Sequence, residues 1–260
     1  DTPRLGWEGR GLRYRFGFPA VEPGDRSILD DYLPVIRTTW ADGDLCYEQE
    51  AYATWLFGDM LTERMAGDDP VVAMVQIRIT NQGNESLVSR LHLTSVVDDQ
   101  TTERLRAKED LVFAAENRLR YLFGVNGAGA LRSQEDGLVY EVTLPPGDSH
   151  TLWVKIPFIA LTEPAEMARL RVLSYAEEKE RVVEYWQRRI AQGAQLETPN
   201  EMLNNFYRTH LMHMLVINDR EPGADRNVAR CGGFFYGSFP DEGCMVISDL
   251  DRRNYTQEAE

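Results

Sequence analysis

The period of the hydrophobic pattern changes once along this chain, and that change constrains the fold more than any other feature. Up to about residue 160, apolar side chains recur at every second position, which is the spacing of half-buried β-strands. After about residue 174 they recur every three or four positions, which is the spacing of amphipathic helices. The sequence therefore predicts a β domain followed by helices, with a boundary between about residues 161 and 174.

The β part has the pattern of strands joined by short turns. Residues 12–16 alternate between apolar and polar side chains, and three later pairs of segments flank residues that favour turns. Each pair is expected to form a hairpin. The three predicted hairpins join residues 33–40 to 45–55, residues 71–80 to 87–97, and residues 138–144 to 151–159.

Residues 101–120 are compatible with two interpretations. They contain good helix formers, yet they stand in a run of strands, and we favour short strands joined by charged residues. No crossover helix separates the predicted strands. An antiparallel sandwich is therefore expected rather than a parallel sheet.

The C-terminal part predicts helices over residues 164–170, 174–192, 199–217 and 245–251. Ser174 and Thr198 each precede a Glu by three residues, which is the spacing of a capping box. Pro199 suits the first position of a helix. Gly193 is expected to end its helix in the left-handed conformation.

Composition excludes several classes of partner and cofactor. The net charge of −14 argues against nucleic acid, and no apolar run approaches the roughly 20 residues of a membrane span. The three cysteines, Cys46, Cys231 and Cys244, lack metal-ligand spacing. Buried free thiols in a reducing, cytoplasmic compartment are favoured. Nothing resembles a phosphate-binding or dinucleotide fingerprint, so neither cofactor nor metal is predicted.

Two pairs of polar residues have a structural and a functional interpretation. His210 and His213 are spaced i, i+3 on the third predicted helix, but no acidic or cysteine ligand lies one turn away. A core or interface pair is therefore favoured over a metal site. Glu48 and Glu50 alternate on one strand, and a solvated face is favoured over ligand binding.

Four stretches resemble bacterial six-hairpin glycosidases, a group that includes glucoamylase-like hydrolases and the trehalose, maltose and cellobiose phosphorylases. The resemblance covers nearly the whole chain and rests on the order of elements and on similar phrases. These phrases are YLPVIRTTWADGDLCYEQEAYAT, VVAMVQIRITNQGNES, TPNEMLNNFYRTHLMHML and YGSFPDEGCMVISDLDRRNYTQEAE.

The resemblance implies a domain order and an activity. Residues 1–162 would form an antiparallel β-supersandwich, residues 163–197 a helical linker, and residues 198–260 the first helical hairpin of a truncated (α/α) toroid. The full protein would cleave an oligosaccharide or glycoside by hydrolysis or phosphorolysis. In this group the general acid lies further along the toroid, so it is expected beyond residue 260, and residues 1–260 alone are expected to be inactive.

The resemblance also places substrate-binding residues in the loop of residues 232–243. The matching candidates are Phe235, Tyr236, Asp241 and Glu242. Their chemistry is suitable, because aromatic faces contact sugar C–H surfaces and carboxylates accept hydrogen bonds from hydroxyls. A purely structural role stays open, in which the aromatic residues fill space between sandwich and helices and the acids favour the start of the helix over residues 245–251.

Two further alternatives follow from the same features. The chain could instead be a non-catalytic carbohydrate-binding or interaction module built on the sandwich. Apolar positions along the third predicted helix, such as Leu211 and Met214, are expected either to form a homodimer or to pack on the sandwich.

Overall fold

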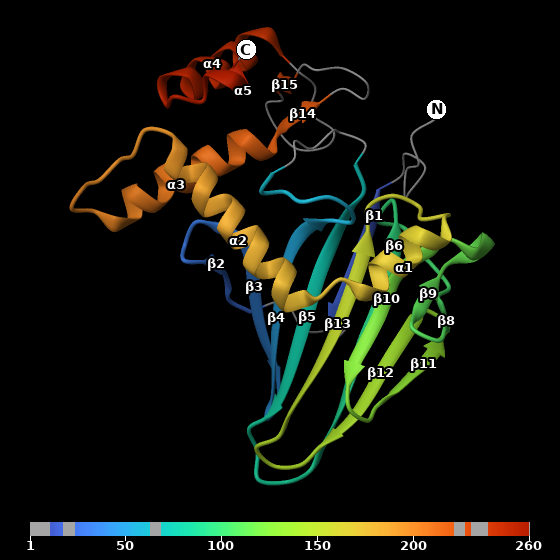
Figure 1. Cartoon of the computed structure of the whole chain (residues 1–260). Helices are drawn as coiled ribbons and strands as arrows, with labels where there is room; N and C mark the ends of the chain where they lie inside the picture. The colour runs from blue at the N-terminus through green and yellow to red at the C-terminus, as the bar shows by residue number, and fades with distance from the viewer. Residues whose placement is uncertain (1–10, 18–23, 63–68, 221–226, 230–238, 260) are drawn as a thin grey trace. The chain divides into compact units, whose positions relative to one another are not determined.

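The computed structural model describes residues 11–17, 24–62, 69–220, 227–229 and 239–259. The chain forms two compact units. The first contains Asp1–Ser27, Val35–Phe57 and Pro70–Glu178, and the second contains Ile28–Pro34, Gly58–Asp69 and Lys179–Glu260. The fold is mainly antiparallel β with C-terminal helices, as the change of hydrophobic period predicts (Figure 1).

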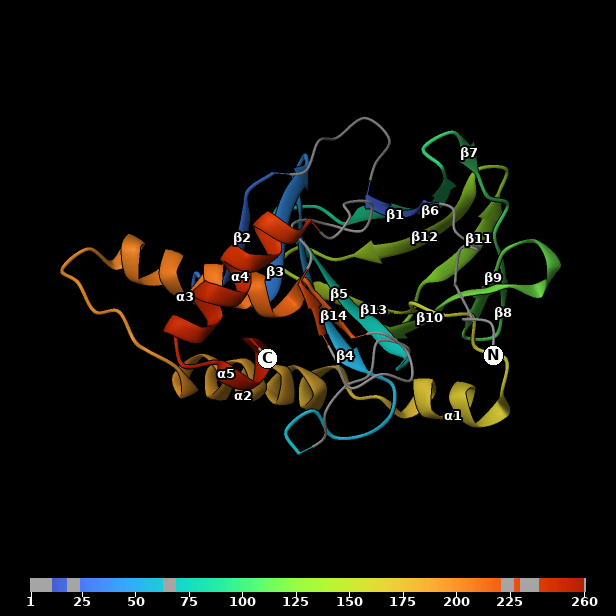
Figure 2. The same cartoon turned by 90° about the horizontal axis from the view of Figure 1, so that it is seen from above.

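The described strands form two antiparallel sheets and a short ribbon. In the larger sheet the strand order is β2 (Arg26–Leu29), β3 (Leu33–Asp42), β4 (Leu45–Trp55), β5 (Val71–Asn81), β13 (Ser149–Pro157), β10 (Leu119–Asn126), β9 (Leu111–Phe113), β8 (Arg106–Lys108). In the smaller sheet it is β1 (Leu12–Gly17), β6 (Leu87–Val97), β12 (Gly137–Leu144), β11 (Ala130–Gln134), with β7 (Thr101–Thr102) paired to β6. Figure 2 shows β6 and β12 in one layer and β5 and β13 in the other.

Only one of the three predicted hairpins is correct in its pairing. Strands β3 and β4 form a hairpin around Gly43, whose φ of 58° fits the predicted Asp-Gly turn. Strands β5 and β6 lie in different sheets, and so do β12 and β13. Both connections are therefore arches that cross from one sheet to the other. A two-residue period shows which segments are strands but not which neighbour each strand pairs with.

Asn81 ties the two arches together and is fully buried. Its Nδ2 donates to the carbonyl of Glu85 (2.7 Å) in its own arch and to that of Leu144 (2.9 Å) in the other. Its backbone N–H donates to Asp148 (3.0 Å), and its carbonyl accepts from Gly147 (3.0 Å). The side-by-side arches thus share one polar residue that satisfies the carbonyls of both turns.

The main core lies between the two sheets. It is built from alternate residues of the long strands, including Ile77, Leu91, Leu93, Tyr121 and Leu152, all fully buried. The expected strands within residues 101–120 are present as β7, β8, β9 and the start of β10, with a 3₁₀ turn, Ala115–Asn117, before β10.

Five helices are present in the described residues: α1 (Pro164–Val172), α2 (Tyr175–Gln192), α3 (Glu201–Val216), α4 (Pro240–Arg252) and α5 (Thr256–Ala259). A two-stranded ribbon, β14 (Asn218–Arg220) and β15 (Asn227–Ala229), separates α3 from α4. Ile190, Leu211, Met214, Leu250 and Tyr255 form the buried core of the second unit. The expectation that Leu211 and Met214 are exposed for dimerisation or packing on the sandwich is therefore wrong, because both point into this helical core.

Candidate functional site

The candidate site begins at the first turn of α4. Phe239 occupies the N-cap position and Pro240 the first helical position, where its missing N–H costs nothing. Asp241 and Glu242 follow in the first turn and both are exposed. A carboxylate suits this position because it faces the positive end of the helix dipole.

Gly243 fixes which side of this turn is covered. It is buried, and a Cβ placed on it would lie 3.9 Å from the side chain and the carbonyl of Ala229 in β15. Asp241 and Glu242 are successive residues, so their side chains project about 100° apart around the helix. Each carboxylate can therefore accept a hydrogen bond from a ligand. The two carboxylates do not face each other across one bond of that ligand.

The aromatic half of the predicted site falls outside the described residues. Phe235 and Tyr236 belong to residues 230–238, for which no placement is given. Their contact with a sugar therefore stays a prediction. Of the four predicted site residues, the structure places Asp241 and Glu242 on one helical turn.

Helices α3 and α4 form an antiparallel pair that carries this turn. Arg253, at the end of α4, donates from Nη1 to the carbonyl of Tyr207 (3.0 Å), and its guanidinium lies 3.9 Å from the centre of the Tyr207 ring. One turn earlier, Asp249 is 3.9 Å from Nδ1 of His210. Because 253 meets 207 and 249 meets 210, the helices run in opposite directions. The start of α4 therefore lies toward the end of α3.

Gly193 and Tyr255 hold α2 close to the end of α4. The Tyr255 hydroxyl donates to the carbonyls of Arg189 (2.5 Å) and Ile190 (3.2 Å) near the end of α2. A Cβ on Gly193 would overlap the Tyr255 ring and the Arg253 carbonyl. The prediction of a left-handed Gly193 is wrong, since it is not among the residues with positive φ. Glycine is required here by close approach of another segment.

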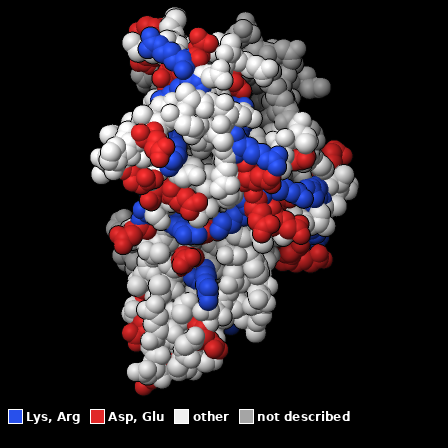
Figure 3. Space-filling view, turned by 60° about the vertical axis from the view of Figure 1, so that its left-hand side comes forward, with Lys and Arg blue, Asp and Glu red and all other residues white. Residues whose placement is uncertain are grey.

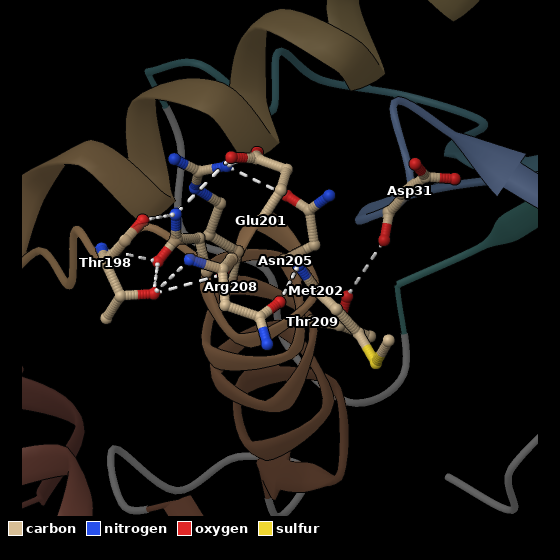
Figure 4. Close-up of polar contacts among 9 residues, drawn as sticks. Asp31, Thr198, Glu201, Met202, Asn205, Arg208 and Thr209 are labelled. Carbon is tan, nitrogen blue, oxygen red and sulfur yellow. Dashed lines mark hydrogen bonds and ion pairs between the residues drawn. The ribbon is translucent and has the colours of Figure 1, made fainter.

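The start of α3 differs from the predicted capping box (Figure 4). The helix begins at Glu201, and the N-cap is Asn200, whose side chain accepts from the Met202 N–H (3.0 Å). Thr198 instead bonds to Asn204, which is buried and accepts from both the N–H and the hydroxyl of Thr198 (2.9 Å each). Sequence reasoning missed Asn204, because an asparagine inside a helix has no periodic signal. The Ser174 cap is supported by one contact, from the Glu177 N–H to its hydroxyl (3.4 Å).

The two histidines of α3 do not form a metal site with other described residues. No group of three potential metal ligands occurs anywhere in the ranges that the structure describes. His210 and His213 are both exposed, so they are not a core pair. His210 stacks on Phe206, with ring centres 5.8 Å apart, and its Nδ1 lies 3.4 Å from Nη2 of Arg253.

In the first unit, buried polar groups cluster where β4 meets the start of α2. Glu50 is buried, accepts from Nε of Arg37 (2.9 Å) and from the hydroxyl of Tyr175 (2.9 Å). Burial and the Glu50 charge together raise the pKa of Tyr175. The favoured solvated face is thus correct for Glu48, which is exposed, and wrong for Glu50. These contacts hold the first turn of α2 to strand β4, and we assign them no catalytic role.

A buried lysine anchors α1 in the same unit. Nζ of Lys155 donates to three carbonyls at the end of α1, those of Leu170 (2.9 Å), Arg171 (2.9 Å) and Leu173 (2.7 Å). The lysine supplies a positive charge to the negative end of the helix dipole. Burial nonetheless lowers the pKa of Lys155. The sequence pattern shows only that Lys155 lies in a predicted strand. Its contacts with the end of α1 can be identified only from the tertiary structure.

Acidic and basic side chains lie next to one another on the face drawn in Figure 3. Cys244 is exposed and Cys46 half-buried, so the expectation of buried thiols is wrong for Cys244, while Cys231 lies outside the described residues. None of the described helices has the length and hydropathy needed to cross a membrane.

Comparisons with known proteins give a distant similarity of fold. No protein-family model matches the sequence, and no curated protein matches it. Among solved structures, the chain is similar to a bacterial glucoamylase crystallised in complex with acarbose, with a TM-score of 0.44 and 9% identity. The alignment covers 95% of this chain and 43% of that one. The chain therefore spans less than half the length of the structure it matches.

Proposed function

We propose that this chain is the N-terminal part of a carbohydrate-active enzyme, a glycoside hydrolase or phosphorylase that cleaves a glycosidic bond. The observation that carries the proposal is the order of elements: an antiparallel two-sheet sandwich, the connecting helices α1 and α2, and then the antiparallel pair α3 and α4. This is the order that the resemblance to six-hairpin glycosidases implies. The division into residues 1–162, 163–197 and 198–260 is part of the same proposal.

Asp241 and Glu242 are proposed to bind the sugar and not to perform the chemistry. Both are exposed on the first turn of α4, directly after the aromatic segment that contains Phe235 and Tyr236. Carboxylates accept hydrogen bonds from sugar hydroxyls, and aromatic rings pack on sugar C–H faces. Glycosidic cleavage needs carboxyl groups on both sides of the bond, or one acid and phosphate. Two successive residues of a helix cannot provide that geometry. The resemblance to six-hairpin glycosidases implies a general acid further along the toroid, and we propose that it lies beyond residue 260.

The test compares a longer form of the chain, extending past Glu260, with residues 1–260 on a panel of oligosaccharides, with and without phosphate. We expect turnover by the longer form only. Asp241→Asn or Glu242→Gln in the longer form is expected to raise KM about tenfold, because each removes a charged hydrogen-bond acceptor. Glu180→Gln, on the exposed side of α2, is the matched control and is expected to leave KM unchanged.

The other outcomes separate the alternatives. Saccharide binding by residues 1–260, with no turnover by the longer form, would show that the protein is a carbohydrate-binding module and not an enzyme. If neither form binds or cleaves any saccharide, the carbohydrate assignment is wrong. Equal effects of Asp241→Asn and Glu180→Gln on KM would show that α4 does not contribute to the sugar site.

A further inference from the structure

The outer face of the larger sheet carries a tryptophan beside a glycine. Trp153 on β13 is paired with Gly124 on β10, and it points away from the core because Val154, the next residue, is fully buried between the sheets. Lys155, two positions beyond Trp153, contacts the end of α1 from the same outer face (Figure 1). A Cβ on Gly124 would lie 4.0 Å from Cε3 of Trp153, so the indole extends toward the space that a side chain at position 124 would fill. Trp153 is half-buried, so the ring is held against the sheet and still presents apolar surface to solvent.

Five polar side chains lie around Trp153 on this face. In the register of β4, β5, β13 and β10, one row across the sheet contains Glu48, Arg78, Thr151 and Asn126, and the next row contains Gln76 and Trp153. All five polar side chains are exposed or half-buried. Among the residues that the structure describes, none is hydrogen-bonded or ion-paired to any of these five side chains. We call the five, together with Trp153, the tryptophan platform.

Charged residues on the outer face of the smaller sheet are arranged differently. Arg90 on β6 forms an ion pair with Glu141 on β12 (2.9 Å), and Arg132 on β11 lies 3.9 Å from the same carboxylate. Those charges are satisfied by one another. The polar groups of the tryptophan platform instead face solvent from neighbouring strands, which hold them in fixed positions beside an aromatic ring. Rigid strands that present unpaired donors and acceptors in this way are suited to binding a ligand.

We propose that the tryptophan platform is a saccharide-binding surface of the first unit, in addition to the sugar site proposed at α4. Aromatic rings pack on the C–H faces of sugars, while amide, guanidinium and carboxylate groups form hydrogen bonds with the hydroxyls. The platform supplies both kinds of group within two adjacent rows of the sheet. The choice of a saccharide among flat ligands that carry hydroxyls rests on the proposed function.

The charges of the platform favour a neutral saccharide. Glu48 and Arg78 occupy directly paired positions on β4 and β5, and the other platform residues are uncharged. The platform therefore has no net charge, although the whole chain has a net charge of −14. A neutral ligand is compatible with this balance, whereas an anionic polysaccharide would be repelled by the negative field of the chain.

The dimensions of the platform suit a short oligosaccharide. Its longer row crosses four strands, from β4 to β10, which is roughly 14 Å at the usual spacing between strands. A saccharide lying across the strands could place one ring on Trp153 and its hydroxyls beside Gln76 and Arg78. We expect the contact with Trp153 to supply most of the affinity, because it buries apolar surface.

The test is native gel electrophoresis of residues 1–260 in gels that contain soluble starch, mixed-linkage β-glucan, galactomannan or dextran sulfate. We expect at least one of the three neutral polysaccharides to retard the chain, and dextran sulfate not to retard it. Trp153→Ala is expected to abolish the retardation, and Trp153→Phe to keep part of it because a ring remains. Arg78→Ala is expected to weaken the affinity about tenfold. Arg132→Ala, which removes an exposed arginine from the other sheet, is the matched control and is expected to bind as the original protein does.

Near-ultraviolet circular dichroism checks the fold of each variant. If Trp153→Ala does not fold, Trp153→Phe and Arg78→Ala decide the result. The proposal is overturned if no neutral polysaccharide retards the chain, or if Arg132→Ala weakens binding as much as Arg78→Ala does. A concentration-dependent dimer that Trp153→Ala abolishes would also overturn it, because the face would then bind a second copy of the chain.

The platform and the proposed enzyme can fail separately. Retardation that depends on Trp153, with no turnover by the longer form of the chain, would support the platform and contradict the enzyme. Turnover by the longer form, with retardation that Trp153→Ala and Arg78→Ala leave unchanged, would overturn the platform alone.

Discussion

The hydroxyl of Tyr140 on β12 and Nε2 of His150 on β13 are hydrogen-bonded at 2.6 Å, and this pair joins the two sheets of the sandwich. The rings are also stacked, with centres 5.6 Å apart and an interplanar angle of 20°. A Cβ on Gly129 would overlap the Tyr140 hydroxyl, so only glycine fits at position 129. The contact lies beside the arch that connects β12 to β13.

Acid is expected to weaken the fold through this pair. Burial lowers the pKa of His150 below its usual value, so the unfolded chain takes up a proton at a higher pH than the folded chain does. The stability contributed by neutral His150 is fully present above a pH of about 6.5 and is lost as the pH falls toward the folded-state pKa. Urea unfolding between about pH 7.5 and 5 should show this loss in the original protein and a smaller loss in His150→Gln. His92→Gln is the control, and an equal pH dependence in all three proteins would contradict the prediction.

Alkali is expected to unfold the protein through its buried tyrosines. Burial raises the pKa of Tyr47 and of Tyr140 to about 12, and it also raises the pKa of Tyr14, Tyr121 and Tyr175. Raised pKa values give stability that is complete below a pH of about 10 and is lost as the pH rises toward the folded-state values. Burial raises the pKa of Tyr255 as well, so six tyrosines act in this direction. Lys155 acts in the opposite direction, because its pKa is lowered, but it is a single group.

Ultraviolet absorbance of phenolate, followed together with circular dichroism, is the measurement for the alkaline prediction. We expect some of the 11 tyrosines to titrate near pH 10 and the buried ones only as the circular dichroism signal is lost. A single titration of all tyrosines with the folded signal intact would show that the buried hydroxyls are accessible.

Asn81→Ala is expected to lower the free energy of unfolding by about 2 kcal/mol, because the buried carbonyl of Leu144 and the partly buried carbonyl of Glu85 both lose their donor. Asn84→Ala, at an exposed position of the same turn, is expected to change it by less than about 0.5 kcal/mol. Urea denaturation of both variants is the measurement. Similar values for the two would mean that the shared arch contact contributes little.

Lys155→Met keeps much of the side-chain volume but leaves three carbonyls at the end of α1 without their donor. The free energy of unfolding is expected to fall by about 3 kcal/mol. Hydrogen exchange should also show faster exchange of the α1 amides. Lys108→Met, on the exposed strand β8, is the control, and a loss of equal size there would point to a general effect of removing charge.

The sequence alone was sufficient for the class of the longest segments. Alternation located β3, β4, β5 and β6, and the helical period with Ser174 located α2 close to its observed bounds. The helix predicted over residues 245–251 is part of α4, which begins five residues earlier, at Pro240. These features are local, since strand and helix periods reflect which side of a segment is buried. Asp241 and Glu242 could be expected at the start of α4, because acidic side chains suit the positive end of the helix dipole.

Only the tertiary structure decided which segments meet. Alternation is the same in a strand that forms a hairpin and in one that arches to another sheet, so the pairing of β5 with β13 depended on contacts such as those of Asn81. The burial of Leu211 and the exposure of Phe206, both apolar residues of α3, were decided by which side of the helix meets Leu250 and Tyr255. A sequence shows that a helix has an apolar side, but a helix apolar on most sides buries only the part that its neighbours can reach.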